Sequence, residues 1–247
     1  MPADTFPSGR RVIVTGAAGG IGRAVVQALA RNDCTVAACD VSGAPVGEVA
    51  GAAVTAAFDV RDREALRAGV ADAIAALGGC DAVVANAGVV DTIHRAERFS
   101  DDEWRKDLET NLYGAFYLAQ AAFEALAESG DGRVVLISSA GAETGIPGQV
   151  AYGASKAGLV GMARTLAAEW APHGIRCNVV MPGFIATPKV LAMPDQVKRS
   201  VTARIPLMRF GAIDELAGTV SFLLSPAAAY INGAVLRVDG GFGLTMR

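Results

Sequence analysis

Short apolar runs alternate with stretches of helical pattern along almost the whole chain, and this alternation restricts the folds open to it. The runs do not alternate polar and apolar residues, which is typical of strands covered on both faces. The predicted strands are Val12–Thr15, Thr35–Cys39, Val54–Phe58, Ala82–Ala85, Val134–Ser138, Arg176–Val180 and Ala234–Val238. The predicted helices are Ile21–Ala30, Asp62–Leu77, Asp102–Glu128, Tyr152–Trp170 and Ile213–Leu224. We therefore expect an α/β fold, a doubly wound, seven-stranded parallel sheet with helices on both faces.

The length of the chain favours one domain. A single α/β domain of 247 residues is common, and neither an internal repeat nor a linker divides the sequence, so we expect residues 1–247 to form one domain. One long stretch, Gly183–Gly211, has a weak pattern and is rich in Pro, Met and Arg. A segment of this kind is typical of a functional lid, here a substrate lid within 183–211, but a pair of short packed helices would also fit.

Composition and charge exclude several classes of protein. A hydrophobic content of 52% argues against disorder, and a net charge of -3 gives no reason to expect nucleic acid as a partner. The four cysteines are scattered, with no C-x-x-C pair and no histidine cluster, so we expect free thiols and no metal site. The first residues lack a signal-peptide core, and no apolar stretch reaches the ~18 residues of a membrane span. We expect a cytoplasmic protein without a membrane anchor.

A glycine-rich turn follows the first predicted strand. Thr15-Gly16-Ala17-Ala18-Gly19-Gly20-Ile21-Gly22 connects this strand to the next predicted helix. Glycines at such a turn let the backbone approach a pyrophosphate, and the helix N-terminus offers free N–H groups and the positive end of a dipole. The flanking strand and helix are those that a dinucleotide site requires.

Asp40 ends the second predicted strand and indicates which dinucleotide is bound. A carboxylate there can accept hydrogen bonds from both hydroxyls of an adenosine ribose, but it would repel the 2′-phosphate of NADP. The neighbouring Val41 and Ser42 offer no compensating cation. The sequence therefore favours NAD over NADP.

Tyr152 and Lys156 lie four residues apart at the start of a predicted helix, so they share one helix face. An ordinary tyrosine has a pKa of about 10 and is protonated at neutral pH. A nearby cation favours the phenolate, so we expect Lys156 to lower the pKa of Tyr152 toward the range of a general acid/base. An exposed lysine beside a structural tyrosine is the alternative interpretation of the same spacing.

Several short motifs accompany this pair. The pattern T-G-x-x-x-G-x-G is met by Thr15, Gly16, Gly20 and Gly22. The other motifs are Asp59-Val60, Asn86-Ala87-Gly88 and Pro182-Gly183-x-x-x-Thr187. From Arg11 to about Gly243 the chain resembles the short-chain dehydrogenase/reductase family, in its ~250-residue single-domain branch with a Rossmann-type sheet. Ala85 replaces the asparagine that often precedes the N-A-G turn, which is a small departure.

The resemblance implies roles for further residues. It adds Ser139 and Asn111 to Tyr152 and Lys156 as catalytic residues: Ser139 contacts the substrate oxygen, and Asn111 holds a water that relays protons toward the lysine. Ser138 is chemically equal to Ser139, and only the spacing to Tyr152 selects between them. Lys156 would also bind the nicotinamide ribose. The implied cofactor-binding residues are Gly16, Gly19, Gly20, Ile21, Gly22, Asp40, Asp59, Val60, Asn86, Ala87, Gly88, Tyr152, Lys156, Pro182, Gly183, Ile185 and Thr187.

These features predict an NAD-dependent oxidoreductase that transfers a hydride between NAD(H) and a secondary alcohol or ketone, with Tyr152 as general acid/base. Its single domain would be both dinucleotide-binding and catalytic. Relatives pair long helices across a two-fold axis, so the resemblance implies a homotetramer, with a dimer as the alternative. Apolar residues in the segments expected around the site, Val89–Glu97, Glu143–Val150 and Phe184–Phe210, suggest a mainly hydrophobic small-molecule substrate.

Three other functions remain open. The chain could be a 3-oxoacyl-thioester reductase, acting on a substrate carried by ACP or CoA, because Arg204–Gly241 resembles such reductases; most of these use NADPH, against which Asp40 argues. It could be a non-catalytic NAD-binding regulatory protein, although the tyrosine and lysine are both present. A nucleotide-sugar epimerase or dehydratase is the third, against which the length argues.

Overall fold

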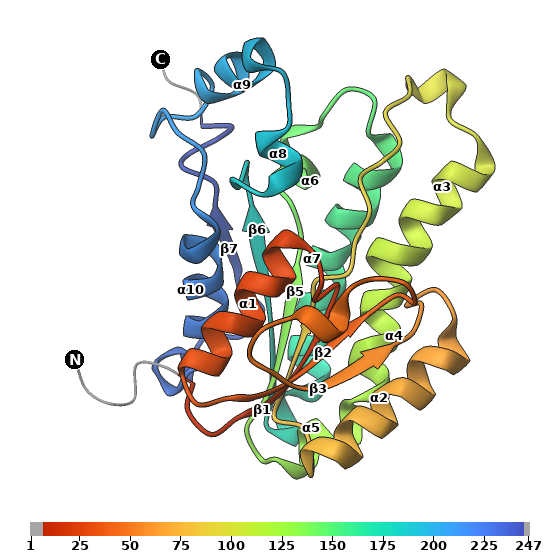
Figure 1. Cartoon of the computed structure of the whole chain (residues 1–247), viewed down its shortest axis with the longest axis vertical. Coiled ribbons are helices and arrows are strands. Elements are labelled where there is room, and N and C mark those ends of the chain that lie inside the picture. The colour runs from red at the N-terminus through yellow and green to blue at the C-terminus, as the bar shows by residue number, and fades with distance from the viewer. Residues whose placement is uncertain (1–6, 245–247) are drawn as a thin grey trace.

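The computed structural model describes residues 7–244 and confirms the predicted α/β fold (Figure 1). Seven strands form one sheet in the order β3-β2-β1-β4-β5-β6-β7, and every neighbouring pair is parallel. The strands are β1 Arg11–Thr15, β2 Thr35–Asp40, β3 Ala52–Ala57, β4 Ala82–Ala85, β5 Gly132–Ile137, β6 Ile175–Pro182 and β7 Val235–Val238. The order reverses between β1 and β4, so a crevice opens there at the carboxyl ends of the strands.

Helices connect the strands. They are α1 Gly20–Arg31, α2 Arg63–Leu77, α3 Asp101–Leu108, α4 Gly114–Ala121, α5 Phe123–Glu128, α6 Gly141–Thr144, α7 Val150–Trp170, α8 Pro188–Leu191, α9 Asp195–Thr202 and α10 Ile213–Leu224. Single turns of 3-10 helix occur at η2 Val46–Glu48, η3 Ala96–Arg98, η5 Ala171–His173 and η6 Pro226–Ala228, and η4 Glu109–Tyr113 is a π-helical turn.

The sheet has a separate apolar core on each face. α1 and α10 cover one face, and α2, α4 and α7 cover the other (Figure 1). Successive residues of a strand enter opposite cores: Ile13 of β1 packs beneath α2, whereas Val12 and Val14 pack beneath α1. Burial on both faces explains why the strand sequences are continuous apolar runs.

Two expectations from the sequence are wrong in detail. β3 is an edge strand whose residues alternate between partly buried and exposed, because only one of its faces is covered. The single helix predicted over Asp102–Glu128 is divided into α3, η4, α4 and α5. At η4 the Gly114 N–H donates to the Glu109 carbonyl, five residues earlier, which shifts the helical hydrogen bonding by one residue.

The weakly patterned stretch 183–211 contains two short helices, α8 and α9, neither of which has a buried residue. The stretch is attached through its ends: Ile185 forms a bridge with Gly211, and Phe184 packs edge-on against Phe242, 5.3 Å between ring centroids. Ile205 joins Phe242 in a small apolar core of its own. Figure 1 shows that α8 and α9 lie beyond the carboxyl ends of the strands.

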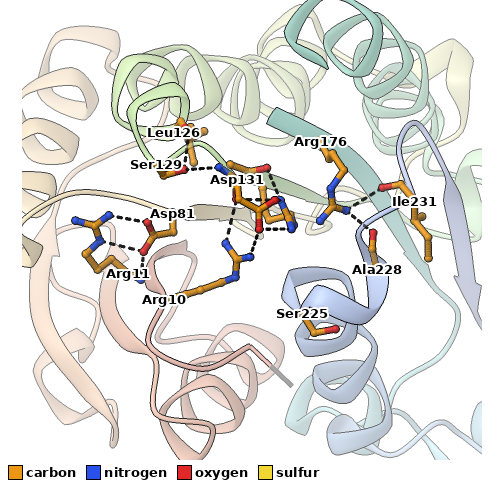
Figure 2. Close-up of polar contacts among 12 residues, drawn as sticks. Arg10, Arg11, Asp81, Leu126, Ser129, Asp131, Arg176, Ser225, Ala228 and Ile231 are labelled. Carbon is orange, nitrogen blue, oxygen red and sulfur yellow. Dashed lines mark hydrogen bonds and ion pairs between the residues drawn. The ribbon is translucent and has the colours of Figure 1, made fainter. Parts of the chain in front are cut away.

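Ion pairs and hydrogen bonds join the strands at the opposite, amino edge of the sheet (Figure 2). Arg11 pairs with Asp81 before β4, with 2.6 Å between Nη2 and Oδ1. Asp131 accepts from both Arg10 and the buried Arg133, which connects the beginnings of β1 and β5. Arg176 at the start of β6 donates to the carbonyl oxygen of Ile231 at 3.0 Å.

Candidate active site

A cavity of about 740 Å³ lies at the carboxyl ends of β1, β2 and β4, within the size range of cofactor sites. Twelve of the predicted cofactor-binding residues line it: Gly16, Gly19, Gly20, Ile21, Gly22, Asp40, Asp59, Val60, Asn86, Ala87, Gly88 and Thr187. Its position at the reversal of strand order is the one at which open parallel sheets bind ligands.

The glycine-rich turn permits close packing that side chains would prevent. Gly16 has a φ of +63°, and a Cβ there would lie 2.8 Å from the Cα of Ala87. A Cβ on Gly22 would lie 2.1 Å from the carbonyl oxygen of Gly16. α1 begins at Gly20, and its first turn holds no acidic residue, so no carboxylate of that turn competes for the positive end of its dipole.

Asn86 holds this turn against β4. Its Nδ2 donates to the carbonyl oxygens of Thr15 and Gly16, both at 3.0 Å, and its backbone N–H donates to Thr15 Oγ1. The amide nitrogen is therefore engaged by the protein's own backbone. Asn86 contributes to the cavity by fixing the glycine-rich turn.

Two carboxylates mark the end of the cavity at β2 and β3. Asp40 accepts hydrogen bonds from the backbone N–H groups of Ala18 and Val41, both at 2.8 Å, which orient its carboxylate. Asp59 pairs with Arg61, with 2.6 Å between Oδ2 and Nη2, and the guanidinium lowers the pKa of this carboxyl. Arg61 also lines the cavity; because it follows a different strand from Asp40, the sequence neighbours of Asp40 gave no indication of it.

Tyr152 and Lys156 lie on α7, with the lysine Nζ 5.9 Å from the centroid of the phenol ring. Lys156 is only 4% exposed and donates from Nζ to the carbonyl oxygen of Ile137 at 2.9 Å. Burial lowers the pKa of Lys156 to about 8. Burial has the opposite effect on the acidic phenol and raises the pKa of Tyr152, which a hydrogen bond from the Ser139 hydroxyl only partly offsets. The predicted lowering of the Tyr152 pKa is therefore wrong: within the protein alone, desolvation is the largest effect, and it raises this pKa.

The two serines at the end of β5 point in different directions. Ser138 is buried, and its hydroxyl donates to the carbonyl oxygen of Lys156 at 2.7 Å. Ser139 lies beside Tyr152, as its effect on the phenol indicates, and its Oγ accepts from the Gly141 N–H at 3.1 Å. Ser139 is therefore the serine whose side chain lies beside the tyrosine.

Asn111 lies in the π-helical turn and is 1% exposed. Its Oδ1 accepts from the Val89 N–H at 2.8 Å, and its Nδ2 donates to the Val89 carbonyl and to Ser155 Oγ. The side chain thus joins the loop after β4 to α7. A Cβ on Gly88 would lie 3.0 Å from Asn111 Oδ1 and 3.2 Å from Lys156 Nζ, so the cavity wall at Gly88 touches both residues.

Some predicted residues do not line the cavity. Neither Tyr152 nor Lys156 lines it, although Lys156 lies against the cavity wall at Gly88. Pro182 ends β6, Gly183 packs against the backbone of Asp239, and Ile185 is buried. Of this segment only Thr187 reaches the cavity, where its hydroxyl caps α8 by accepting from the Val190 N–H.

Three charged residues that the sequence did not indicate as site residues form ion pairs in the cavity lining. Lys189 of α8 pairs with Asp91 in the loop after β4, with 2.6 Å between Nζ and Oδ1, and Lys106 of α3 lies 3.9 Å from the same carboxylate. All three residues line the cavity. They are far apart in the chain and belong to no local motif, so the sequence carries no signal for this contact.

Over residues 7–244, every helix is too short or too polar to cross a bilayer. Within the same range, the structure brings no three side chains of His, Cys, Asp or Glu into a metal-binding group. The cysteines at positions 34, 39, 80 and 177 are free and buried, as expected.

Comparisons with known proteins place this architecture among oxidoreductases. Residues 16–243 match the family model described as enoyl-(acyl carrier protein) reductase. The chain is similar to (3R)-3-hydroxyacyl-CoA dehydrogenase of Mus musculus, with 40% identity over 244 residues that cover 93% of this chain and 94% of the relative.

Two solved structures are also similar to the chain. One, from Sinorhizobium meliloti, is provisionally assigned as a short-chain alcohol dehydrogenase; it has a TM-score of 0.91 and 37% identity, covering 98% of this chain and 100% of that one. The other, from Beutenbergia cavernae, is provisionally assigned as an NAD(P)-dependent gluconate 5-dehydrogenase with NADP bound at low occupancy; it has a TM-score of 0.89 and 35% identity, at the same coverages.

Proposed function

The chain belongs to the short-chain dehydrogenase/reductase family, and from this premise we propose that it transfers a hydride between NAD(H) and a secondary alcohol or ketone. The observation that carries the proposal is the grouping of Ser139, Tyr152 and Lys156, in which the lysine also lies against Gly88 of the cavity wall. Phenol, ammonium and hydroxyl groups in this arrangement suit proton transfer to and from an alcohol oxygen.

The cavity residues fit a dinucleotide. Gly16 and Gly22 allow a diphosphate to approach the backbone, and the first turn of α1 offers its N–H groups to the negative charge. Asp40 suits the hydroxyls of an adenosine ribose, and Asp59 and Val60, which line the same cavity, would contact the adenine. When bound, NAD supplies the acceptor for the hydride.

The protein's own residues control the proton. Tyr152 takes the hydroxyl proton of the alcohol on its phenolate oxygen, and Ser139 donates a hydrogen bond to the substrate oxygen. Lys156 stabilises the phenolate through its charge, which opposes the desolvation that raises the pKa of the phenol. Asn111 holds the loop after β4 against α7, the helix that carries Tyr152 and Lys156. In ketone reduction the same phenol returns the proton.

We propose NAD rather than NADP as the preferred cofactor. Asp40 is held by two backbone N–H groups beside the position of the ribose, where its charge opposes a 2′-phosphate. Arg61 is a cation that lines the same cavity, but Asp59 already pairs with it. An NADP-bound relative makes this a point to measure.

A second candidate is oxidation of 3-hydroxyacyl thioesters or reduction of 3-oxoacyl thioesters. The mouse relative supports it, since its name describes a 3-hydroxyacyl-CoA substrate, and so does the acyl-carrier-protein reductase model. The chemistry at the alcohol carbon is the same, so the two candidates differ in the carrier of the substrate. The same proposal includes a single domain over residues 1–247, a substrate lid within 183–211, a homotetramer and a cytoplasmic location.

The test is a spectrophotometric screen of secondary alcohols and 3-hydroxyacyl thioesters with NAD and with NADP. Tyr152→Phe should lower kcat about a hundredfold or more, because a general acid/base typically contributes that much. Tyr230→Phe removes a fully exposed phenol and is the matched control. Wild-type activity in Tyr152→Phe would refute the mechanism, and a higher kcat/KM with NADP would refute the cofactor preference.

A further inference from the structure

Asp107 is a buried acid to which neither the motifs nor the mechanism assigns a role. It lies near the end of α3, is 1% exposed, and neither carboxylate oxygen has a hydrogen-bond partner among the described residues. Burying an unpaired carboxylate is unfavourable, so a position with no functional demand would favour an apolar residue. α3 does not use Asp107 as a cap, because Ser100 and Glu103 form its capping box.

The surroundings of Asp107 connect it to the proposed site. It precedes Asn111 by four residues, about one helical turn, and Asn111 contacts both α7 and the wall of the cavity. α3 and η4 pack against α7, which carries Tyr152 and Lys156. The charge of Asp107 raises the pKa of Lys156 and so opposes the effect of burial on that group.

The charges around Asp107 come from three elements. α3 contributes Lys106 and Glu103, the loop after β4 contributes Asp91, and α7 contributes Lys156. Lys106 is half exposed and lies 3.9 Å from Asp91, so it has another acidic neighbour. Lys156 is buried, and among residues 7–244 its Nζ donates a hydrogen bond only to a backbone carbonyl. Asp107 and Lys156 are thus a buried anion and a buried cation on helices that pack together, each without a direct ionic partner among the described residues.

We propose that Asp107 is a positioning residue, a fixed negative charge that keeps the Lys156 side chain protonated. The inference rests on the proposed function in one respect: the lysine must be an ammonium to stabilise the Tyr152 phenolate. The same charge also disfavours the Tyr152 phenolate, so Asp107 raises the pKa of both Tyr152 and Lys156. Removing it should lower the pKa of both groups, which moves the whole active pH range toward acid.

The sequence offers a direct way to observe Lys156. The chain has four lysines, Lys106, Lys156, Lys189 and Lys198, so protein labelled with ¹³C at the lysine ε-carbon gives few signals. Lys156→Met identifies the signal of the buried lysine. Its titration midpoint can be followed by NMR in the whole protein, with neither substrate nor cofactor, and burial places the pKa of this group at about 8.

Asp107→Asn should move this midpoint down by about one pH unit, the size expected for a nearby charge in a partly screened interior. Asp107→Glu restores the charge and should return the midpoint close to the wild-type value. Asp102→Asn removes the same charge from an exposed position of the same helix and is the matched control, expected to shift the midpoint by a small fraction of that amount. Asp107→Ser replaces Asp107→Asn if the latter does not fold.

A midpoint in Asp107→Asn or Asp107→Ser that matches wild type would overturn the proposal, and so would equal shifts in Asp107→Asn and Asp102→Asn. Once a substrate is found, the alkaline limit of kcat should move to lower pH by the same amount in Asp107→Asn. A fall in kcat at every pH with no such movement would mark a structural role and contradict the inference. The NMR titration needs no turnover, so it tests the role of Asp107 even if the proposed activity is not found.

Discussion

Replacing Lys156 by methionine is expected to stabilise the fold at neutral pH while abolishing the proposed proton chemistry. Burial lowers the pKa of Lys156 from its ordinary 10.5 to about 8, so keeping the ammonium charged in the folded protein at pH 7 costs about 3 kcal/mol. Methionine removes that cost and fills a similar volume. It also leaves the Ile137 carbonyl without its donor, which costs about 1 kcal/mol. The expected net gain in the free energy of unfolding is about 2 kcal/mol.

The gain should depend on pH in a defined direction. Between about pH 8 and 10.5 the unfolded chain holds a proton on Lys156 that the folded chain has lost, so wild-type stability rises with pH relative to the variant. The advantage of Lys156→Met should therefore decline by about 3 kcal/mol across this window and change sign within it. Below pH 8 the advantage should stay constant.

Denaturant unfolding of wild type and Lys156→Met, measured in parallel from pH 6 to 11, tests this reasoning. Other groups titrate in the same range, but they are common to both proteins and cancel in the difference. A difference in unfolding free energy that is flat across pH 8 to 10.5 would refute the claim that Lys156 is desolvated. Lys156→Arg keeps a charge and should show no stabilisation at neutral pH.

Two further predictions concern a glycine of the cavity wall and a helix cap. Gly88→Ala places a methyl group 3.0 Å from Asn111 Oδ1 and 3.2 Å from Lys156 Nζ, so activity should fall by about tenfold or more. Gly161→Ala is the control, because its methyl group would enter open space beside α7; it should keep the activity and stabilise the fold by roughly 0.5 to 1 kcal/mol. Equal activities in the two variants would contradict the close approach at Gly88. Asp62→Ala removes the side-chain acceptor of two N–H groups at the start of α2 and should cost about 1 kcal/mol in thermal or denaturant unfolding; an unchanged stability would show that the cap contributes nothing.

Local patterns predicted the parts of the molecule that depend on local geometry. The apolar runs predicted parallel strands because both faces of the sheet are buried, and the glycine-rich turn predicted the cavity because Gly16 and Gly22 leave no room for a Cβ. The spacing between Ser139 and Tyr152 selected the serine that lies beside the phenol. The predicted lowering of the Tyr152 pKa is wrong because it rests on the nearby cation alone and omits desolvation, which depends on how tightly the chain packs around the phenol.

Tertiary structure decided the features that join distant segments. Arg61 reaches the same cavity as Asp40 only because β2 and β3 are adjacent strands, and Asp91 meets Lys189 only because α8 lies over the loop after β4. Asp107 has no local signal at all: within its own helix it is one acidic residue among several, and only the packing of α3 on α7 excludes it from water. The sequence alone determined the sheet, the glycine-rich turn and the identity of the proposed acid/base groups, because periodicity and spacing encode them. The charge state of those groups follows from burial, which exists only once the chain has folded.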